Sequence, residues 1–214
     1  VGESGCGKSV SALSILRLVP WPPGKIVGGS INCRGQNLLE MGDEDIRRVR
    51  GREISMVFQE PMTSLDPVLS IGLQLTETMQ HHLGLSPAQA LKRAAELLEM
   101  VGISEPKRRL AQFPHHLSGG MRQRVMIALA LSCEPKLIIA DEPTTALDVT
   151  IQAQILELMK DLTKRLGVSL VVITHTLGVV ARYADRVHVM YAGKIIEMGS
   201  AQKNYHQPHH PDTL

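Results

Sequence analysis

No long hydrophobic run is present in this chain of 214 residues. A membrane-spanning helix needs roughly 20 consecutive apolar residues, and no stretch approaches that length. Cysteine is scarce as well: Cys6, Cys33 and Cys133 are far apart and form no CxxC pair, which argues against a disulfide framework and a thiolate zinc site. We expect a reducing, cytosolic setting in which any membrane role comes through a partner.

An excess of charge of one sign is also missing. The formal net charge is +2, with 23 Lys and Arg against 21 Asp and Glu, so electrostatics alone gives no argument for a nucleic-acid surface. Hydrophobic residues make up 43% and charged residues 21%, the composition of a globular protein with one sizeable core. We therefore expect a single domain over residues 1–214 and no nucleic-acid partner.

A glycine-rich turn opens the chain, ahead of an apolar-periodic helix expected over residues 10–18. The turn matches G-x-x-x-x-G-K-[ST] at every fixed position, and its members are Gly2, Glu3, Ser4, Gly5, Cys6, Gly7, Lys8 and Ser9. In this pattern the glycines let backbone N–H groups point inward around phosphates, Lys8 bridges the outer phosphates and Ser9 ligates Mg²⁺. A chance glycine-rich turn is the alternative for such a match taken alone.

A strand normally enters a phosphate-binding loop and holds it. None precedes residue 2, so we expect the N-terminal strands of the fold to be missing from this chain. Downstream, alternation over 26–33 predicts an antiparallel strand that turns at Gly35, and the apolar run 54–58 predicts a short strand that leads to Gln59. Residues 61–67 predict a turn-rich connection.

Helical signals replace strand signals over residues 71–132. Ser86 is followed by Pro87 and Gln89, the pattern of an N-cap, a first-turn proline and a capping-box partner. Apolar residues then recur at helical spacing. The segment 71–132 therefore predicts an inserted α-helical subdomain within the single domain.

Two continuous apolar runs, 137–140 and 170–173, predict strands that are buried on both faces of a parallel sheet. An amphipathic helix expected over 151–166 separates them and ends at Gly167, which makes a βαβ unit. Residues 187–198 predict a closing hairpin. The predicted fold class is thus α/β, with a parallel-sheet core, a helical insertion and an antiparallel β portion.

An acidic pair, Asp141 and Glu142, follows the first of these apolar strands. A buried strand that ends in a carboxylate delivers it to the Mg²⁺ beside bound phosphates. The next carboxylate, Glu142, is then placed to polarise an attacking water. A solvated strand end is the alternative interpretation of such a pair by itself, but together with the phosphate loop the pair predicts ATP hydrolysis with Mg²⁺.

Ser118, Gly119 and Gly120 open another helix and give it an anion-binding end. One chain cannot use this end and the phosphate loop on the same nucleotide. The two ends together therefore favour a site that is shared between two subunits.

These motifs, in this order, resemble those of the ABC-transporter ATPases over essentially the whole chain. The resemblance implies a P-loop NTPase fold with a RecA-like parallel-sheet core, in which the signature segment 118–120 covers ATP held by the phosphate loop of another subunit. It implies that Gln59 senses Mg²⁺ and links the site to the membrane partner, that Asp148 contacts the opposite subunit, and that His175 contacts the γ-phosphate. Taken singly, Gln59 is interpreted as a strand-end polar residue and His175 as a structural histidine.

Three segments are similar to one branch of this family, the importers of dipeptides and oligopeptides: FQEPMTSLDP (58–67), LSGGMRQRVM (117–126) and ADEPTTALDVTIQAQIL (140–156). The resemblance implies an ATP-hydrolysing subunit that pairs with a second ATPase subunit and works with integral membrane permease subunits. A solute-binding protein acts indirectly, and the location is peripheral, at the cytoplasmic face of the plasma membrane. Importers of nickel or glutathione in the same branch, and a soluble ABC ATPase outside transport, are the alternatives.

The chain departs from the family pattern at a few positions. Thr176 follows His175 where the family usually has aspartate, which removes a carboxylate beside that histidine. Residues 206–212 resemble the start of the branch's C-terminal extension, with Asp212 where tyrosine is common. The family's adenine-stacking aromatic is expected upstream of residue 1, and Trp21, in a proline-rich loop, is no substitute for it.

Overall fold

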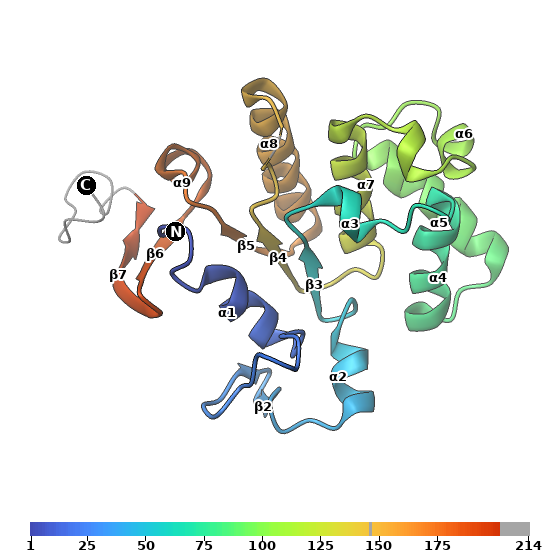
Figure 1. The fold of residues 1–214 in the computed structure, drawn as a ribbon. Coiled ribbons are helices and arrows are strands. Elements are labelled where there is room, and N and C mark those ends of the chain that lie inside the picture. The colour runs from blue at the N-terminus through green and yellow to red at the C-terminus, as the bar shows by residue number, and fades with distance from the viewer. Residues whose placement is uncertain (146, 202–214) are drawn as a thin grey trace. The chain divides into compact units, whose positions relative to one another are not determined.

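A computed structural model of the protein describes residues 1–145 and 147–201, which form an α/β structure (Figure 1). The predicted extension at 206–212 lies outside the described residues. Contacts divide the chain into two compact units, Val1–Ile46 with Ile173–Leu214, and Arg47–Val172. The predicted phosphate loop belongs to the first unit and the predicted acidic pair to the second.

The first unit begins with the glycine-rich turn and helix α1 (Lys8–Ile15). The helix ends before the predicted residue 18 because Arg17 adopts a left-handed conformation with φ 52°. The Leu18 N–H then bonds to the Leu13 carbonyl at 2.8 Å, as in a Schellman motif. A left-handed residue at this place satisfies the last carbonyls of the helix and turns the chain away from its axis.

A short antiparallel hairpin follows, formed by β1 (Asn32–Cys33) and β2 (Gln36–Asn37). Arg34 and Gly35 join the strands with φ values of 52° and 81°, the positive angles that a two-residue hairpin turn of type I′ requires. The strand predicted over 26–33 is confirmed only for its last two residues, because these alone have a partner across the turn.

The first unit ends with helix α9 (Leu177–Tyr183) and a second hairpin of β6 (Arg186–Tyr191) and β7 (Lys194–Ser200). The predicted turn is confirmed at Ala192 and Gly193, whose φ values are 44° and 79°. Alternate residues of the hairpin turn inward because side chains of a strand point to opposite faces. The buried core of the hairpin contains Val187, Val189 and Ala201.

Three strands form the sheet of the second unit, in the order β3 (Ile54–Val57), β4 (Leu137–Asp141) and β5 (Ser169–Ile173). β3 and β4 are parallel. The expected burial is confirmed for β4, whose last four residues are all buried, but it is wrong for β5, where Val171 is 47% exposed. β5 stands at one edge of this sheet and the mostly buried β3 at the other, so the edge position alone does not explain the exposure of Val171.

Helix α8 (Val149–Leu166) connects β4 to β5, as the predicted βαβ unit requires. Gly167 ends the helix in a left-handed conformation, with φ 66° and ψ 30°, so the predicted stop is confirmed. The buried face of the helix contains Ile155, Leu156, Met159, Leu162 and Thr163. Leu166, in the last turn of the helix, is 45% exposed.

Besides α9, two short helices lie where no helix is predicted. α2 (Asp43–Val49) has three acidic residues in its first turn and Arg47 and Arg48 in its last, charges that complement the helix dipole. α3 (Pro61–Ser64) is a single turn within the predicted turn-rich connection. Proline is compatible with the first helical position because the N–H it lacks has no helical partner there.

The stretch predicted as a helical insertion is helical (green in Figure 1). It contains α4 (Ile71–Leu83), α5 (Pro87–Met100), α6 (Pro106–Leu110), the 3₁₀ turn Pro114–His116 and α7 (Gly119–Leu131). The predicted capping box is confirmed: the Ser86 hydroxyl accepts from the Gln89 N–H at 3.4 Å, and Gln89 Oε1 accepts from the Ser86 N–H at 2.9 Å. The apolar faces of these helices share one core with β3, β4 and α8.

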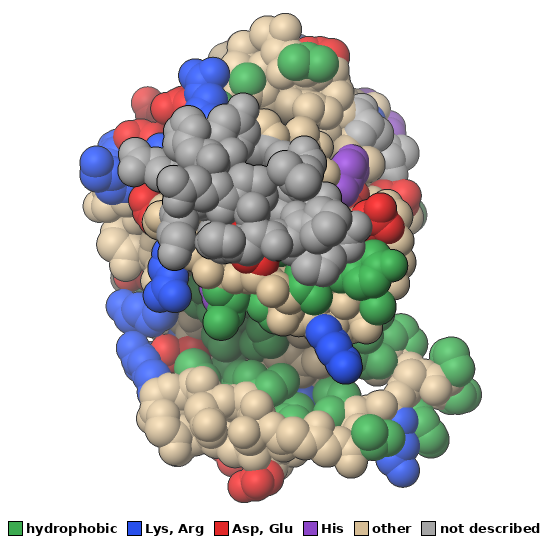
Figure 2. All heavy atoms as spheres, turned by 90° about the vertical axis from the view of Figure 1, so that its left-hand side faces the viewer, with side chains coloured by type: hydrophobic (Ala, Val, Ile, Leu, Met, Phe, Trp, Pro, Cys, Tyr) green, Lys and Arg blue, Asp and Glu red, His purple; other side chains and the backbone are tan. Residues whose placement is uncertain are grey.

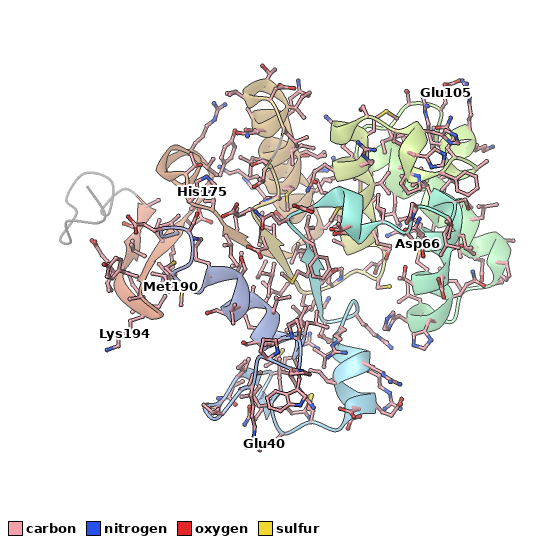
Figure 3. All side chains as sticks on the ribbon, viewed as in Figure 1. Glu40, Asp66, Glu105, His175, Met190 and Lys194 are labelled. Atoms are coloured by element: carbon pink, nitrogen blue, oxygen red, sulfur yellow. The ribbon has the colours of Figure 1, made fainter. Side chains whose placement is uncertain are left out.

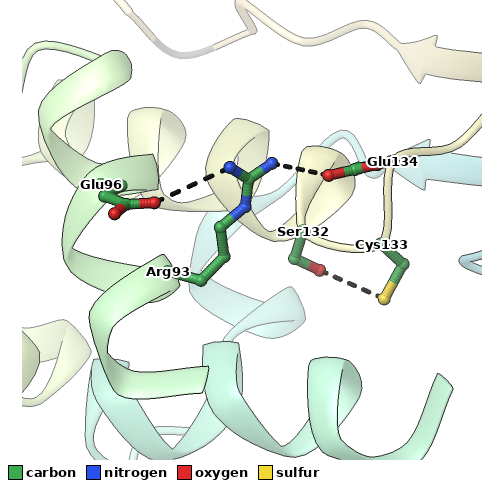
Figure 4. Close-up of polar contacts among 5 residues, drawn as sticks. All are labelled: Arg93, Glu96, Ser132, Cys133 and Glu134. Atoms are coloured by element: carbon green, nitrogen blue, oxygen red, sulfur yellow. Dashed lines mark hydrogen bonds and ion pairs between the residues drawn. The ribbon is translucent and has the colours of Figure 1, made fainter. Parts of the chain in front are cut away.

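Arg93 of α5 ties this helix to the connection that follows α7 (Figure 4). Its Nη2 lies 2.9 Å from Glu134 Oε1, and its Nη1 lies 3.8 Å from Glu96 Oε2. Because both glutamates are exposed, each ion pair contributes at most about 1 kcal/mol.

Cys133 lies next to Glu134 in the same connection. The Ser132 hydroxyl lies 3.6 Å from Cys133 Sγ. Burial raises the pKa of the Cys133 thiol, which keeps the thiol protonated and unreactive.

The surface carries charges of both signs. On the face that Figure 2 presents, Lys and Arg side chains of the described residues are interspersed with Asp, Glu and hydrophobic side chains. Within the ranges 1–145 and 147–201, no helix combines the length and the hydropathy that crossing a bilayer requires.

Gly102, just after α5, has φ 75°, and a Cβ there would lie 2.9 Å from Arg124 Nη1. That guanidinium is fixed because it donates to the Val101 carbonyl at 2.6 Å. We expect Gly102→Ala to lower the free energy of unfolding of the full-length protein, measured in urea, by about 1–3 kcal/mol. Gly84→Ala is the matched control, since Gly84 has φ 65° and no atom within 4 Å of an added Cβ. Equal losses in the two variants would contradict a role for Arg124.

Candidate nucleotide site

Lys8 lies within the glycine-rich loop as the first residue of α1. Its side chain is buried, and its Nζ donates to the carbonyl oxygens of Gly2 and Glu3, both at 2.7 Å. Nζ also lies 3.8 Å from Cys6 Sγ. The loop's own backbone thus holds the ammonium group near the N-terminus of α1, where the helix dipole favours anions.

The glycines of the loop have backbone conformations or close neighbours that disfavour a side chain. Gly7 caps α1 in a left-handed conformation with φ 104°. A Cβ on Gly2 would lie 2.1 Å from the carbonyl oxygen of Met190, which Figure 3 labels on β6. The Gly193 N–H donates to the Cys6 carbonyl at 2.9 Å. The loop is therefore fastened on both sides to the β6–β7 hairpin.

The outer rim of the loop is open. Glu3, Ser4 and Gly5 are exposed, and a Cβ on Gly5 would meet nothing within 4 Å. Ser9, the second residue of α1, is half-buried. A ligand can therefore reach the loop from solvent without displacing a side chain at Gly5.

In the second unit, the carboxyl ends of β3 and β4 bring two predicted residues together. Val57 pairs with Ala140, so Gln59 and Glu142, each two positions further on, leave adjacent strands at the same edge. Gln59 Nε2 donates to Glu142 Oε2 at 3.1 Å, and Thr145 Oγ1 donates to the same oxygen at 3.1 Å. Two donors on one carboxylate oxygen fix the orientation of the Glu142 side chain.

Glu142 has a strained backbone. Its φ is 44°, a value that costs a residue other than glycine on the order of 1–3 kcal/mol and that clusters at functional sites. The preceding residue, Asp141, is the last of β4 and is 5% exposed. A carboxylate this buried needs a partner or a metal ion in order to carry a charge.

The signature segment forms the beginning of α7. The Ser118 hydroxyl caps the helix by accepting the N–H of the third helical residue at 3.3 Å. A Cβ on Gly119 would lie 3.6 Å from Leu147 Cδ2, and one on Gly120 would lie 3.1 Å from Ile151 Cγ2. The two glycines therefore let the first turn of α7 pack directly against the start of α8.

Asp148 ends the connection between β4 and α8, of which the structure describes residues 142–145 and 147–148 and which we call the β4–α8 loop. Its Oδ1 caps α8 by accepting the Ile151 N–H at 2.9 Å. Gln152 Nε2 donates to the carbonyls of Thr144 and Leu147, at 3.1 and 2.9 Å, so a single amide holds two points of this loop. Asp148 is exposed, and its contact with an opposite subunit stays a prediction.

His175 lies just beyond the end of β5, ahead of α9 (Figure 3). It is exposed, whereas Thr174 is buried. The Thr174 hydroxyl accepts the Thr176 N–H at 3.1 Å, so the backbone on both sides of His175 is held in a short turn. Thr176, at the position of the family's aspartate, contributes its backbone to this turn.

The structure distributes the predicted residues over both units. The phosphate loop and His175 lie in the first, and the second contains Gln59, Asp141, Glu142, Ser118, Gly119, Gly120 and Asp148. Thr145 and Gln152 support the site but are not among the predicted residues. Each has a local sequence signal: Thr145 is a hydroxyl residue three positions after a carboxylate, and Gln152 is an amide one turn after an N-cap.

Cys6 gives a chemical test of the loop, because its buried side chain lies within it, with Sγ 3.8 Å from Lys8 Nζ. We expect N-ethylmaleimide bound to Cys6 to abolish nucleotide binding by the full-length protein, and bound ATP to slow the reaction. Cys133 is the internal reference, since the raised pKa of its thiol leaves little thiolate to react. Peptide mapping by mass spectrometry measures both adducts. ATP binding that survives complete modification of Cys6 would contradict its place at the nucleotide.

The fold and the loop define the class of this protein: an α/β protein with a glycine-rich loop at a helix N-terminus that matches the phosphate-loop pattern. Residues 1–145 match the profile of the family described as ABC transporter. The chain belongs to the ABC transporter family.

Relatives and solved structures agree with this assignment. The chain is 57% identical to the oligopeptide transport ATP-binding protein OppD of Bacillus subtilis (strain 168) over 213 residues, which is 100% of this chain and 60% of that protein. It is 53% identical to the dipeptide transport ATP-binding protein DppD of the same organism, again over all of this chain, and covers 64% of that protein. The chain thus spans less than two thirds of the length of either relative.

A solved dimeric ATP-binding cassette, in a post-hydrolysis state bound to ADP and Pi, has a similar fold. The TM-score is 0.80 at 30% sequence identity, over 94% of this chain and 83% of that one. The predicted fold class, an ABC ATPase with a parallel sheet and antiparallel strands, is confirmed by this likeness.

Proposed function

We propose that the protein binds and hydrolyses ATP and thereby powers an ABC importer of dipeptides or oligopeptides. The observation that carries the proposal is the Glu142 carboxylate, oriented by Gln59 and Thr145 at the end of a buried strand. The 57% identity to an oligopeptide transport ATP-binding protein supports the class of solute.

The phosphates of ATP bind in the glycine-rich loop. Lys8 is already turned into this loop by the Gly2 and Glu3 carbonyls, so its ammonium group needs only to exchange these partners for phosphate oxygens. The Ser9 hydroxyl, the Asp141 carboxylate and the Gln59 amide oxygen are hard oxygen ligands, which fit Mg²⁺. When bound, Mg²⁺ supplies charge neutralisation at the β- and γ-phosphates.

Hydrolysis needs a base beside the γ-phosphate, and Glu142 takes this role. Its carboxylate orients the attacking water and accepts a proton from it, while the donors Gln59 and Thr145 hold the carboxylate in place. His175 contacts the γ-phosphate. The remaining catalysis is positioning and charge stabilisation by Lys8 and the helix N-termini.

The complete site is shared between two ATPase subunits arranged head to tail. The segment Ser118–Gly120 of one covers the nucleotide in the loop of the other, and Asp148 contacts the opposite subunit. The similarity to a cassette solved as a dimer with ADP and Pi supports this arrangement. Integral membrane permease subunits hold the pair at the cytoplasmic face of the plasma membrane, and a solute-binding protein acts through them.

Copurification and solute-stimulated ATP hydrolysis test this proposal. The full-length protein is expressed with candidate membrane subunits, and phosphate release is measured in lipid discs with a candidate solute-binding protein. We expect copurification and stimulation by dipeptides or oligopeptides. Stimulation by nickel or glutathione alone would change the solute class, and ATP hydrolysis without any membrane partner would favour a soluble ABC ATPase. Absence of ATP hydrolysis in every arm would refute the proposal that the protein is an ATPase.

A further inference from the structure

Gln123 is a buried polar residue that the proposed mechanism does not use. It lies in the second turn of α7 and is 1% exposed. Within residues 1–145 and 147–201, its Nε2 is buried and has no hydrogen-bond partner. Arg109 and Arg122 also have such an atom, but both are partly exposed. Native proteins leave few fully buried donors unpaired, because each one is destabilising.

Gln123 lies on the face of α7 that meets α8. Gly119 and Gly120 precede it by four and three residues, and this spacing places all three on one helix face. Side chains added at the two glycines would touch Leu147 and Ile151. Gln123 is therefore one turn behind the contact between the signature segment and the end of the β4–α8 loop.

Gln152 shows what a paired amide does at this loop. From the α8 side, its Nε2 donates to the Thr144 and Leu147 carbonyls. From the α7 side, the Gln123 amide makes no such bond in the described part of the chain. The same loop includes Thr145, whose hydroxyl donates to Glu142. A small movement of the loop relative to α7 therefore changes both the surroundings of Gln123 and the support of the proposed base.

We propose that Gln123 is a positioning residue for the β4–α8 loop, whose acceptor appears when two nucleotide-loaded subunits close. This inference rests on the proposed function. Nucleotide bound at the N-terminus of α7 moves that helix against the loop, and the Gln123 amide then donates to a loop carbonyl. The unpaired donor disfavours the open arrangement and the new bond favours the closed one, so the closed population rises. In the closed pair, the Gln123 bond thereby adds an anchor from α7 to the loop whose Thr145 hydroxyl already donates to Glu142.

Gln123→Met in the full-length protein tests the inference, because methionine keeps the volume and removes the amide. We expect the melting temperature to rise by about 2–4 °C, since an unpaired buried donor is removed. We expect kcat for ATP hydrolysis to fall roughly 10-fold or more, because the loop is no longer placed. KM for ATP should stay within about 2-fold, since the phosphate loop is untouched. A merely structural residue does not make a protein both more stable and slower.

Thr163→Val is the matched control. Thr163 is a buried polar residue of α8 whose hydroxyl already bonds to the Met159 carbonyl at 2.7 Å. It should lower the melting temperature and leave kcat unchanged.

Wild-type hydrolysis is measured first, and its absence would refute the proposed function rather than this inference. With active wild type, a Gln123→Met protein of raised melting temperature and unchanged kcat overturns the role of Gln123. A lowered melting temperature also overturns it, because the amide is then already paired in the open subunit. If Gln123→Met does not fold, Gln123→Leu replaces it, and failure of both variants to fold counts against the inference for the same reason.

Discussion

Glu142→Gln in the full-length protein is expected to lower kcat roughly 10²- to 10⁴-fold, the range for loss of a general base. The amide has the shape of the carboxylate, so its oxygen can still accept the hydrogen bonds that Gln59 and Thr145 make at 3.1 Å. It cannot accept a proton from water. ATP should therefore remain bound, and the paired subunits should persist. Phosphate release measures kcat, and size-exclusion chromatography with ATP measures the pair.

Thr145→Val is the companion variant, since it removes one donor to Glu142 Oε2 and keeps the carboxylate. Loss of one hydrogen bond to a charged group predicts a decrease in kcat of roughly 10-fold. Turnover that is unchanged in Glu142→Gln would remove Glu142 from the role of base. Equally large losses in the two variants would point to the geometry of the loop rather than to proton transfer.

Lys8→Met is expected to weaken ATP binding by at least about 10-fold, because a charged donor to phosphate is lost. The substitution also removes the bonds from Nζ to the Gly2 and Glu3 carbonyls, so the loop loses the contacts that shape it. Both effects lower the affinity of the loop for the nucleotide. Titration of the full-length protein with a fluorescent ATP analogue measures the dissociation constant.

Lys194→Met provides the charge-matched control for Lys8→Met. Lys194 is an exposed residue of the β6–β7 hairpin, next to Gly193, which holds the loop at Cys6 (Figure 3). The two variants change the net charge equally, so a general electrostatic effect would weaken ATP binding in both. Unchanged affinity in Lys8→Met would exclude the glycine-rich loop as the phosphate site.

Features set by a few neighbouring residues could be predicted from the sequence. The capping box at Ser86, the helix stop at Gly167 and the hairpin turn at Ala192 each depend on contacts within one turn of chain. The phosphate loop belongs to the same group, because its glycines and Lys8 lie within eight consecutive residues. In each of these patterns, the residues that form the pattern also make the contacts that fix the local structure.

Features that depend on packing could not be predicted. The contact of Gln59 with Glu142 joins residues 83 positions apart and follows from the register of β3 against β4. The exposure of Val171 depends on how β5 is covered, which its apolar sequence does not encode. The unpaired amide of Gln123 depends likewise on how α7 packs. Sequence patterns name the candidate residues of the site, whereas the contacts that support these residues depend on packing.

Ser118 serves two neighbours with different parts of one hydroxyl group. A lone pair of its oxygen accepts the Met121 N–H at 3.3 Å, and the hydrogen on the same oxygen can point away from the helix toward an anion. Threonine preserves both capacities. Aspartate preserves the cap but brings negative charge to the place where phosphate is expected, so a Ser118→Asp chain should fold normally and yet reject the partner's nucleotide. A substitution at this one hydroxyl can therefore remove recognition of the partner's nucleotide while the chain still folds.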